Sequence, residues 1–237
     1  LDLQQEKLLF LLSFYGYFHQ NFTLSCYDFI FGWSVHLATI KKKKKMPIIK
    51  QIIDRSVTVK QAVANSCILP AEQAAEMIAH SLANKGKLML CGNGGSAGDS
   101  QHLAAEFVAT LDHTRPRKGL PAIALTTDTS FLTAYANDFG FDGVFARQVE
   151  TLGHTGDVLI AISTSGNSKN VVAAAKQARE LGILVIAMTG QTGGKLAKNC
   201  DLLIAVPSDI TMHIQEGHIA LGHAITAHVE QLLQVDE

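Results

Sequence analysis

The chain has 237 residues, a length that fits one domain or one domain with an appendage. A hydrophobic content of 47% with 17% charged residues excludes a disordered chain and indicates a globular protein with a sizeable core. The formal net charge of −1 provides no overall basic field, so we expect no nucleic-acid partner. The four cysteines are far apart and form no CxxC pair, which argues against a disulfide framework and is compatible with a reducing cytoplasm.

Residues 1–45 differ in composition from the rest. They hold Trp33, three of the four tyrosines and six of the eleven phenylalanines, and they end in a block of lysines, Lys41–Lys45. No run reaches the roughly 20 apolar residues of a membrane span, and the lysines come too late for a secretory signal. We expect residues 1–45 to be an extension outside the domain, which then covers 46–237. An interfacial anchor made of the aromatic stretch and the lysines is the alternative.

From Met46 onward, segments of helical spacing alternate with short apolar runs. The predicted helices cover 48–65, 71–82 (directly after Pro70), 97–110, 130–137, 169–181 and 213–233, and the predicted strands cover 87–91, 121–126, 157–163, 183–189 and 202–206. Strands that alternate with helices indicate a parallel sheet covered on both faces. We therefore predict an α/β three-layer sandwich of flavodoxin-like type with a five-stranded parallel sheet and N-terminal helices. Such a sheet binds ligands beyond the carboxyl ends of its strands.

Two loops rich in small residues follow predicted strands. The loop Ser163-Thr-Ser-Gly-Asn-Ser168 precedes a predicted helix, whose free amides and partial positive charge suit a phosphate group. The alternative is that Ser and Asn only cap this helix, but the loop has more donors than one cap needs. The loop Gly92-Asn-Gly-Gly-Ser96 resembles part of a dinucleotide fingerprint. That interpretation requires an acidic residue at the end of a second strand, and Asp112 does not fit because it ends a predicted helix.

Four polar side chains on two predicted helices form a candidate reaction centre. His102 and Glu106 are four residues apart, so both project from one face of their helix, and Gln215 and His223 lie within one stripe of the last helix. A surface hydrogen-bonded pair is the alternative for His102 and Glu106. A carboxylate and imidazoles near a phosphate site suit aldose–ketose isomerisation, and the same side chains can bind zinc.

Four ordered motifs together resemble one family. They are the segment Cys91-Gly-Asn-Gly-Gly-Ser-Ala-Gly-Asp-Ser-Gln-His102-Leu-Ala-Ala-Glu106, the segment Ala136-Asn-Asp-Phe-Gly140, the segment Ile162-Ser-Thr-Ser-Gly-Asn-Ser168, and Ile214-Gln-Glu-Gly-His218 followed by His223. Over 46–233 the chain resembles the bacterial sedoheptulose 7-phosphate isomerases, which have the sugar-isomerase (SIS) fold. Residues 1–45 take no part in the resemblance.

The resemblance implies conversion of D-sedoheptulose 7-phosphate to D-glycero-D-manno-heptose 7-phosphate, a precursor of surface glycans, by a cytoplasmic homotetramer with active sites at subunit interfaces. It implies that Glu106 is the general base and His223 its acid–base partner. His102, Glu106, Gln215 and His223 would form a zinc site. The implied substrate contacts are Asn93, Gly94, Gly95, Asn137, Asp138 and Gln215, with Ser163, Thr164, Ser165 and Ser168 at the phosphate.

Two positions depart from the family pattern. Met212 stands where many members have an aspartate, and Ala97-Gly98 replaces a His-Cys pair that is common after the glycine loop. Two further functions are alternatives: a non-catalytic SIS protein that binds the replication initiator DnaA, and an isomerase for another sugar phosphate. The DnaA-binding relative lacks the acidic and histidine residues at the positions of Glu106 and His223, and both are present here.

Overall fold

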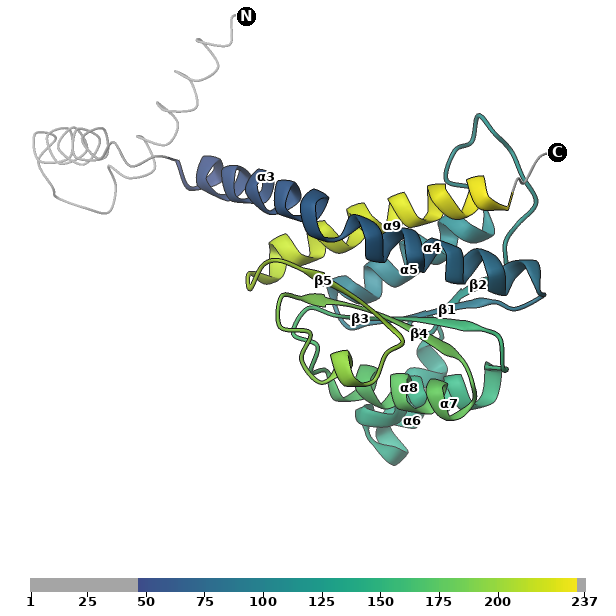
Figure 1. The fold of residues 1–237 in the computed structure, drawn as a ribbon. Coiled ribbons are helices and arrows are strands. Elements are labelled where there is room, and N and C mark those ends of the chain that lie inside the picture. Colours follow the sequence, from purple (N-terminus) through teal and green to yellow (C-terminus); the bar gives the residue numbers. More distant parts are fainter. Residues whose placement is uncertain (1–46, 234–237) are drawn as a thin grey trace, which may run out of the picture. The chain divides into compact units, whose positions relative to one another are not determined.

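The computed structural model describes residues 47–233, and the prediction for residues 1–45 lies outside this range (Figure 1). From Ile52 onward the described chain forms one compact unit. Among the described residues, none of the helices is both long and apolar enough to cross a membrane.

The sheet has five parallel strands in the order β2-β1-β3-β4-β5. These are β1 (Leu88–Cys91), β2 (Ala122–Ala124), β3 (Val158–Ser163), β4 (Leu184–Gly190) and β5 (Leu202–Val206). Every residue of β1 and β3 is buried, as the continuous apolar runs indicated, because helices cover both faces. The predicted fold class and the number of strands are confirmed.

One layer of helices packs on the face to which Leu88 and Leu90 point. It contains α4 (Ile68–Ala83), α5 (Gly95–Val108) and α9 (Thr211–Leu232). Helix α3 (Ile48–Ser66) precedes α4, and its Val59 and Val63 pack against the same core. The predicted start of α4 after Pro70 was wrong, because Pro70 is the third residue of this helix. Proline is tolerated in the first turn, where its missing N–H has no partner inside the helix.

The second layer packs on the opposite face, to which Met89 and Cys91 point. It contains α6 (Thr129–Phe139), α7 (Val144–Leu152) and α8 (Lys169–Glu180). Figure 1 shows these three helices on the other side of the sheet from α4, α5 and α9. Helix α7 was not predicted from the sequence; it has nine residues and lies between Gly143 and Gly153.

Helices α5 and α9 lie side by side and run in the same direction. Near the start of both helices, Gly95 of α5 adjoins Gln215 of α9. Further along both helices, Leu103 of α5 adjoins Gly222 of α9, so the two helices are parallel. A Cβ atom placed on Gly222 would lie 2.6 Å from Leu103 Cδ1, closer than real Cβ contacts. Glycine at position 222 therefore allows the two helices to approach closely, and this approach brings the candidate site together.

His218 lies in the core, between α9 and the end of β4. Its side chain is completely buried, its Nε2 is 3.0 Å from the carbonyl oxygen of Thr189, and its Nδ1 has no hydrogen-bond partner. Burial lowers the pKa of His218 from its ordinary value of 6.5 to about 4, partly offset by the bond to Thr189. His218 therefore packs in the core and is not part of the candidate reaction centre.

We expect the stability contributed by neutral His218 to fall in acid. Because its folded-state pKa lies below the unfolded value, the unfolded chain takes up the proton first, and the contribution is complete above pH 6.5 and declines as the pH falls towards 4. His218→Gln removes this titration. At fixed protein concentration, wild type should lose about 2 kcal/mol more of its unfolding free energy than the variant between pH 7 and pH 5, as measured by urea denaturation. Parallel pH dependences of the two proteins would contradict this.

Candidate functional site

Three of the predicted ligand side chains meet between α5 and α9. His102 Nε2 lies 2.7 Å from His223 Nε2 and 3.3 Å from Glu106 Oε1. Ligand atoms of all three side chains lie within 4.8 Å of one another. The Glu106 side chain is 18% exposed and that of His102 is 49% exposed, so the cluster is held in place but open to a substrate.

Helical geometry explains how the sequence forms this cluster. His102 and Glu106 are one turn apart on α5, as predicted, and His223 reaches them from α9 directly after Gly222. The two imidazole rings meet edge to face, with centroids 5.0 Å apart. The surface-pair alternative for His102 and Glu106 is therefore incomplete, since a third residue from a distant part of the chain joins them.

Gln215, the fourth predicted ligand, lies near the start of the same two helices. Its carboxamide covers Gly95, where a Cβ atom would be 2.3 Å from Gln215 Nε2. Gly95 precedes His102 by seven residues, about 10 Å along a helix axis and on nearly the same face. Gln215 thus lies in line with the cluster, at the end nearer the carboxyl edge of the sheet.

Asp99 belongs to the same helical stripe and was not predicted. It lies three residues before His102 and seven before Glu106, and its Oδ2 atom is buried without a hydrogen-bond partner. Burial raises the pKa of Asp99, and the nearby His102 lowers it by a smaller amount. The same spacing that identified His102 and Glu106 extends back to Asp99, so the sequence held the information to include it.

The predicted phosphate loop connects β3 to α8. Ser163 Oγ and Ser168 Oγ are 3.0 Å apart, and the Asn167 amide donates to Ser165 Oγ. Ser168 is the N-cap residue of α8, but its side chain accepts no capping hydrogen bond. By contrast, Asp128 caps α6 by accepting from the amide of Phe131 at 2.9 Å. The capping alternative therefore does not explain the hydroxyl of Ser168.

The two small-residue loops share one edge of the sheet, as predicted, because β1 and β3 are parallel neighbours. Asn93 and Asn170 join the loops by two reciprocal amide hydrogen bonds of 2.9 Å. The Asn93 side chain is thus already hydrogen-bonded to another residue of the protein. Asn170, the second residue of α8, was missed, and its spacing carries no motif that would have identified it.

Two predicted substrate contacts lie elsewhere. Asn137 and Asp138 are exposed on α6, in the layer opposite α5 and α9, and the Asn137 amide donates to Asp138 Oδ1 at 2.8 Å. The structure does not support the dinucleotide-binding interpretation of the glycine loop either. Asp112 lies in the loop after α5, not at the end of a strand, and its carboxylate accepts from Thr114 and Arg115.

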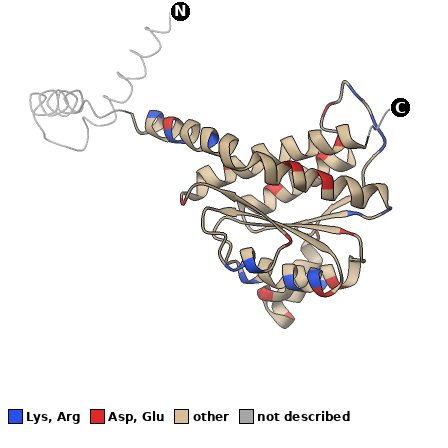
Figure 2. Cartoon of the chain, viewed as in Figure 1, with Lys and Arg blue, Asp and Glu red and all other residues tan. Residues whose placement is uncertain are grey.

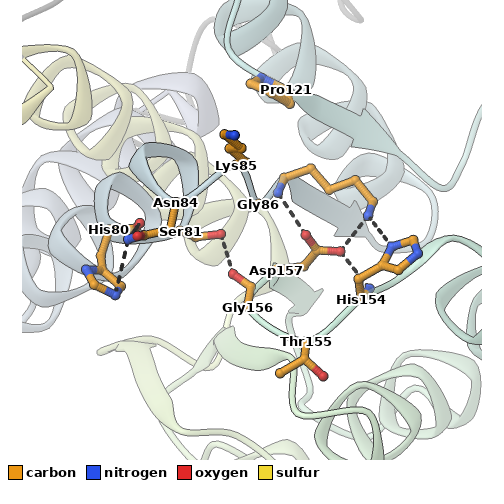
Figure 3. Close-up of a pocket in the computed structure, with 11 residues that line it drawn as sticks. His80, Ser81, Asn84, Lys85, Gly86, Pro121, His154, Thr155, Gly156 and Asp157 are labelled. Carbon is orange, nitrogen blue, oxygen red and sulfur yellow. Dashed lines mark hydrogen bonds and ion pairs between the residues drawn. The ribbon is translucent and has the colours of Figure 1, made fainter.

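A hollow of about 350 Å³ lies at the other edge of the sheet, where β1 and β3 begin (Figure 3). Its buried Asp157 accepts from the Lys87 amide at 2.9 Å, from Lys87 Nζ at 2.5 Å and from the His154 amide at 2.8 Å. These bonds join the starts of two strands, so they have a structural explanation. None of the predicted site residues lines this hollow.

The donor set of the cluster fits a metal ion. Two imidazoles and one carboxylate are typical zinc ligands, and one ligand atom of each side chain lies within 4.8 Å of the others. Figure 2 shows Lys and Arg on several separate elements, with Asp and Glu among them.

Comparisons with known proteins agree on one family. The SIS domain model matches residues 53–190. A phosphoheptose isomerase of Aneurinibacillus thermoaerophilus is 47% identical over 187 residues, which cover 78% of this chain and 93% of the relative. One from Neisseria meningitidis is 50% identical over 75% of this chain and 91% of the relative. The structure of phosphoheptose isomerase GmhA from Neisseria gonorrhoeae superposes with a TM-score of 0.72 at 47% identity, covering 77% of this chain and 97% of that one.

Gly222→Ala tests whether the close approach of α5 and α9 builds the site. The added methyl group would overlap the Leu103 side chain, so we expect a loss of about 1–3 kcal/mol in unfolding free energy. Because His223 is the next residue, kcat should fall as well. Gly98→Ala is the matched control, since no atom lies within 4 Å of its added methyl group and helical Gly→Ala gains roughly 0.5–1 kcal/mol. Equal stabilities of the two variants would argue against the constraint.

Proposed function

Because the chain belongs to the phosphoheptose isomerase family of SIS-domain proteins, we propose that it interconverts D-sedoheptulose 7-phosphate and D-glycero-D-manno-heptose 7-phosphate through an enediolate. The observation that supports this is the convergence of His102, Glu106 and His223 between α5 and α9. The DnaA-binding alternative is not favoured, since that function needs neither Glu106 nor His223.

Aldose–ketose isomerisation moves a proton between two neighbouring carbons. In our proposal the Glu106 carboxylate takes the proton from the carbon next to the carbonyl and returns it to the neighbouring carbon. His223 exchanges the proton at the substrate oxygens, so that the enediolate carries little charge. Glu106 is suited to this role because its side chain is largely buried but adjoins the exposed ring of His102.

The phosphate of the substrate would bind at the start of α8. Ser163, Thr164, Ser165 and Ser168 would supply hydroxyl donors, and the first amides of α8 would supply N–H donors and a partial positive charge. The absence of a capping bond from Ser168 supports this assignment. Asn93, Gly94 and Gly95 lie on the neighbouring loop and would contact the sugar through the backbone, since the Asn93 side chain bonds Asn170.

We also propose one zinc ion per subunit, held by His102, Glu106 and His223, with Gln215 as the fourth ligand. When bound, such an ion would stabilise negative charge on the substrate oxygens. The chain itself supplies the ligands, their orientation by α5 and α9, and the proton transfers described above. Because the Gln215 carboxamide covers Gly95, it would have to turn towards the other three side chains to serve as the fourth ligand.

Assembly as a cytoplasmic homotetramer with active sites at subunit interfaces is part of the proposal. Helix α6 has no buried residue, and Phe139 and Phe141 are 73% and 53% exposed. Such apolar surface supports contact with another subunit. A subunit contact at α6 would also allow Asn137 and Asp138 to reach the active site of the neighbouring subunit. The catalytic domain is proposed to cover 46–237.

Glu106→Gln tests the base. The substitution keeps the size of the side chain but removes the basic oxygen, so we expect kcat to fall by about 10²–10⁴ with folding unchanged. Product formation from sedoheptulose 7-phosphate is followed by NMR, with and without added zinc, and folding by circular dichroism. Glu76→Gln, an exposed residue of α4, is the matched control. Near-wild-type turnover of Glu106→Gln would exclude the base role.

Ser168→Ala separates phosphate binding from helix capping. If the hydroxyl binds phosphate, KM should rise about tenfold, the loss of roughly one hydrogen bond to a charged group, while stability stays within 0.5 kcal/mol. If the hydroxyl were a cap, stability would fall by about 0.5–2 kcal/mol and KM would not change. Ser66→Ala is the control for loss of an exposed hydroxyl, since the Ser66 side chain donates to the Ala62 carbonyl of its own helix and otherwise contacts only the neighbouring Cys67 Sγ.

A further inference from the structure

Arg117 is an almost buried cation outside the cluster described above. It lies in the segment between α5 and β2, and its side chain is only 3% exposed. Its Nη2 donates to the carbonyl oxygen of Glu106 and its Nη1 to that of Phe107, both at 2.8 Å. Its Nε donates to Glu230 Oε1 at 2.7 Å. One guanidinium group therefore joins the last turn of α5 to a carboxylate of α9.

The last turn of α5 needs this partner. Helix ends leave carbonyl groups without partners in the helix, and a glycine in the left-handed conformation commonly completes them. Helix α5 has no such glycine, since its C-cap residue Ala109 has φ −88° and ψ −93°. Arg117 donates to the Glu106 carbonyl and to that of Phe107, which also accepts from the Leu120 amide at 3.0 Å. Its positive charge faces the negative end of the helix dipole.

Glu230 depends on Arg117 in the same way. It lies two residues before the end of α9, where a carboxylate faces the negative end of its own helix. Arg117 and the Leu111 amide, which donates at 3.3 Å, compensate this charge. Glu230 follows His223 by seven residues, two turns of helix, so the two side chains leave α9 on nearly the same face.

We propose that the ion pair of Arg117 and Glu230, called here the clamp, positions Glu106 against His223. Glu106 is the third residue from the end of α5, in a turn that frays easily when its carbonyls are unpaired. The clamp binds the carbonyl of Glu106 itself and fixes α9 beyond His223. Arg117 is thus a positioning residue and touches no substrate. The inference rests on the proposed role of Glu106.

The experiment removes the clamp without leaving a buried charge. Arg117→Met alone would leave the Glu230 carboxylate without its cationic partner, and loss of one partner of a buried ion pair destabilises a protein strongly. Replacement of both partners by apolar residues is often neutral. The double variant Arg117→Met/Glu230→Met should fold, with kcat reduced 10- to 100-fold by misplacement of the base and KM within about twofold. Arg117→Lys keeps the positive charge but lacks the planar guanidinium group that bonds the carbonyls and the carboxylate at once. Its kcat should therefore lie between those of wild type and the double variant.

The control is Arg115→Met. Arg115 lies in the same segment and also forms an ion pair, with Asp112, but its side chain is 87% exposed and binds no helix carbonyl. Its kcat should equal that of wild type. A folded double variant with wild-type kcat would overturn the clamp, and if the double variant does not fold, wild-type kcat in Arg117→Lys would do so.

Glu106→Gln belongs in the same series because it separates the two proposals. An inactive Glu106→Gln together with a fully active double variant would reject the clamp alone. An active Glu106→Gln would reject the role of Glu106 itself, whatever the clamp variants do. A fall in kcat with constant KM in the double variant, beside an inactive Glu106→Gln, supports both.

Discussion

The close parallel packing of α5 and α9 is the constraint on which the site depends. The two helices can approach because residue 222 has no side chain where Leu103 packs, and residue 95 has none where Gln215 lies. Only at this separation can His102 Nε2 and His223 Nε2 come within 2.7 Å. Protein interiors are packed densely enough that a single additional methyl group at such a contact must move a neighbour. The geometry of the site therefore depends on two glycines, because neither has a side chain that would separate the helices.

The two ends of this helix pair are held by different polar groups. At one end of the helix pair, Gln215 covers the start of α5, and at the other end Arg117 and Glu230 join the two C-terminal turns. The reacting side chains lie between these two fixed ends. A helix terminus is usually the most mobile part of a helix, and Glu106 lies in one. In the proposed clamp, the buried Arg117 therefore has a role in the site beyond pairing the carbonyls at the end of α5.

The sequence predicted the sheet almost completely and the site in part. The continuous apolar runs of β1 and β3 identify fully buried parallel strands, and the i, i+4 spacing identifies His102 and Glu106 as one face. Residue spacing could not show that His223 meets them, because that contact depends on how two helices distant in sequence pack. Only the family resemblance supplied it. Asn170 and Arg117 were missed for the same reason, since each acts through a partner far away in the chain.

The separation of the two halves of the site suits the substrate class. The hydroxyl-rich loop lies at the carboxyl edge of the sheet, whereas His102 lies about 10 Å further along α5 than Gly95. In a heptose 7-phosphate the phosphate and the reacting carbons are at opposite ends of the molecule, so one group can be bound while the other reacts. Binding energy from a remote phosphate can then hold the reacting carbons in place, which raises the rate only if the base is itself fixed. In the proposed mechanism, rigid support of Glu106 and a distant phosphate loop are thus two parts of one catalytic arrangement.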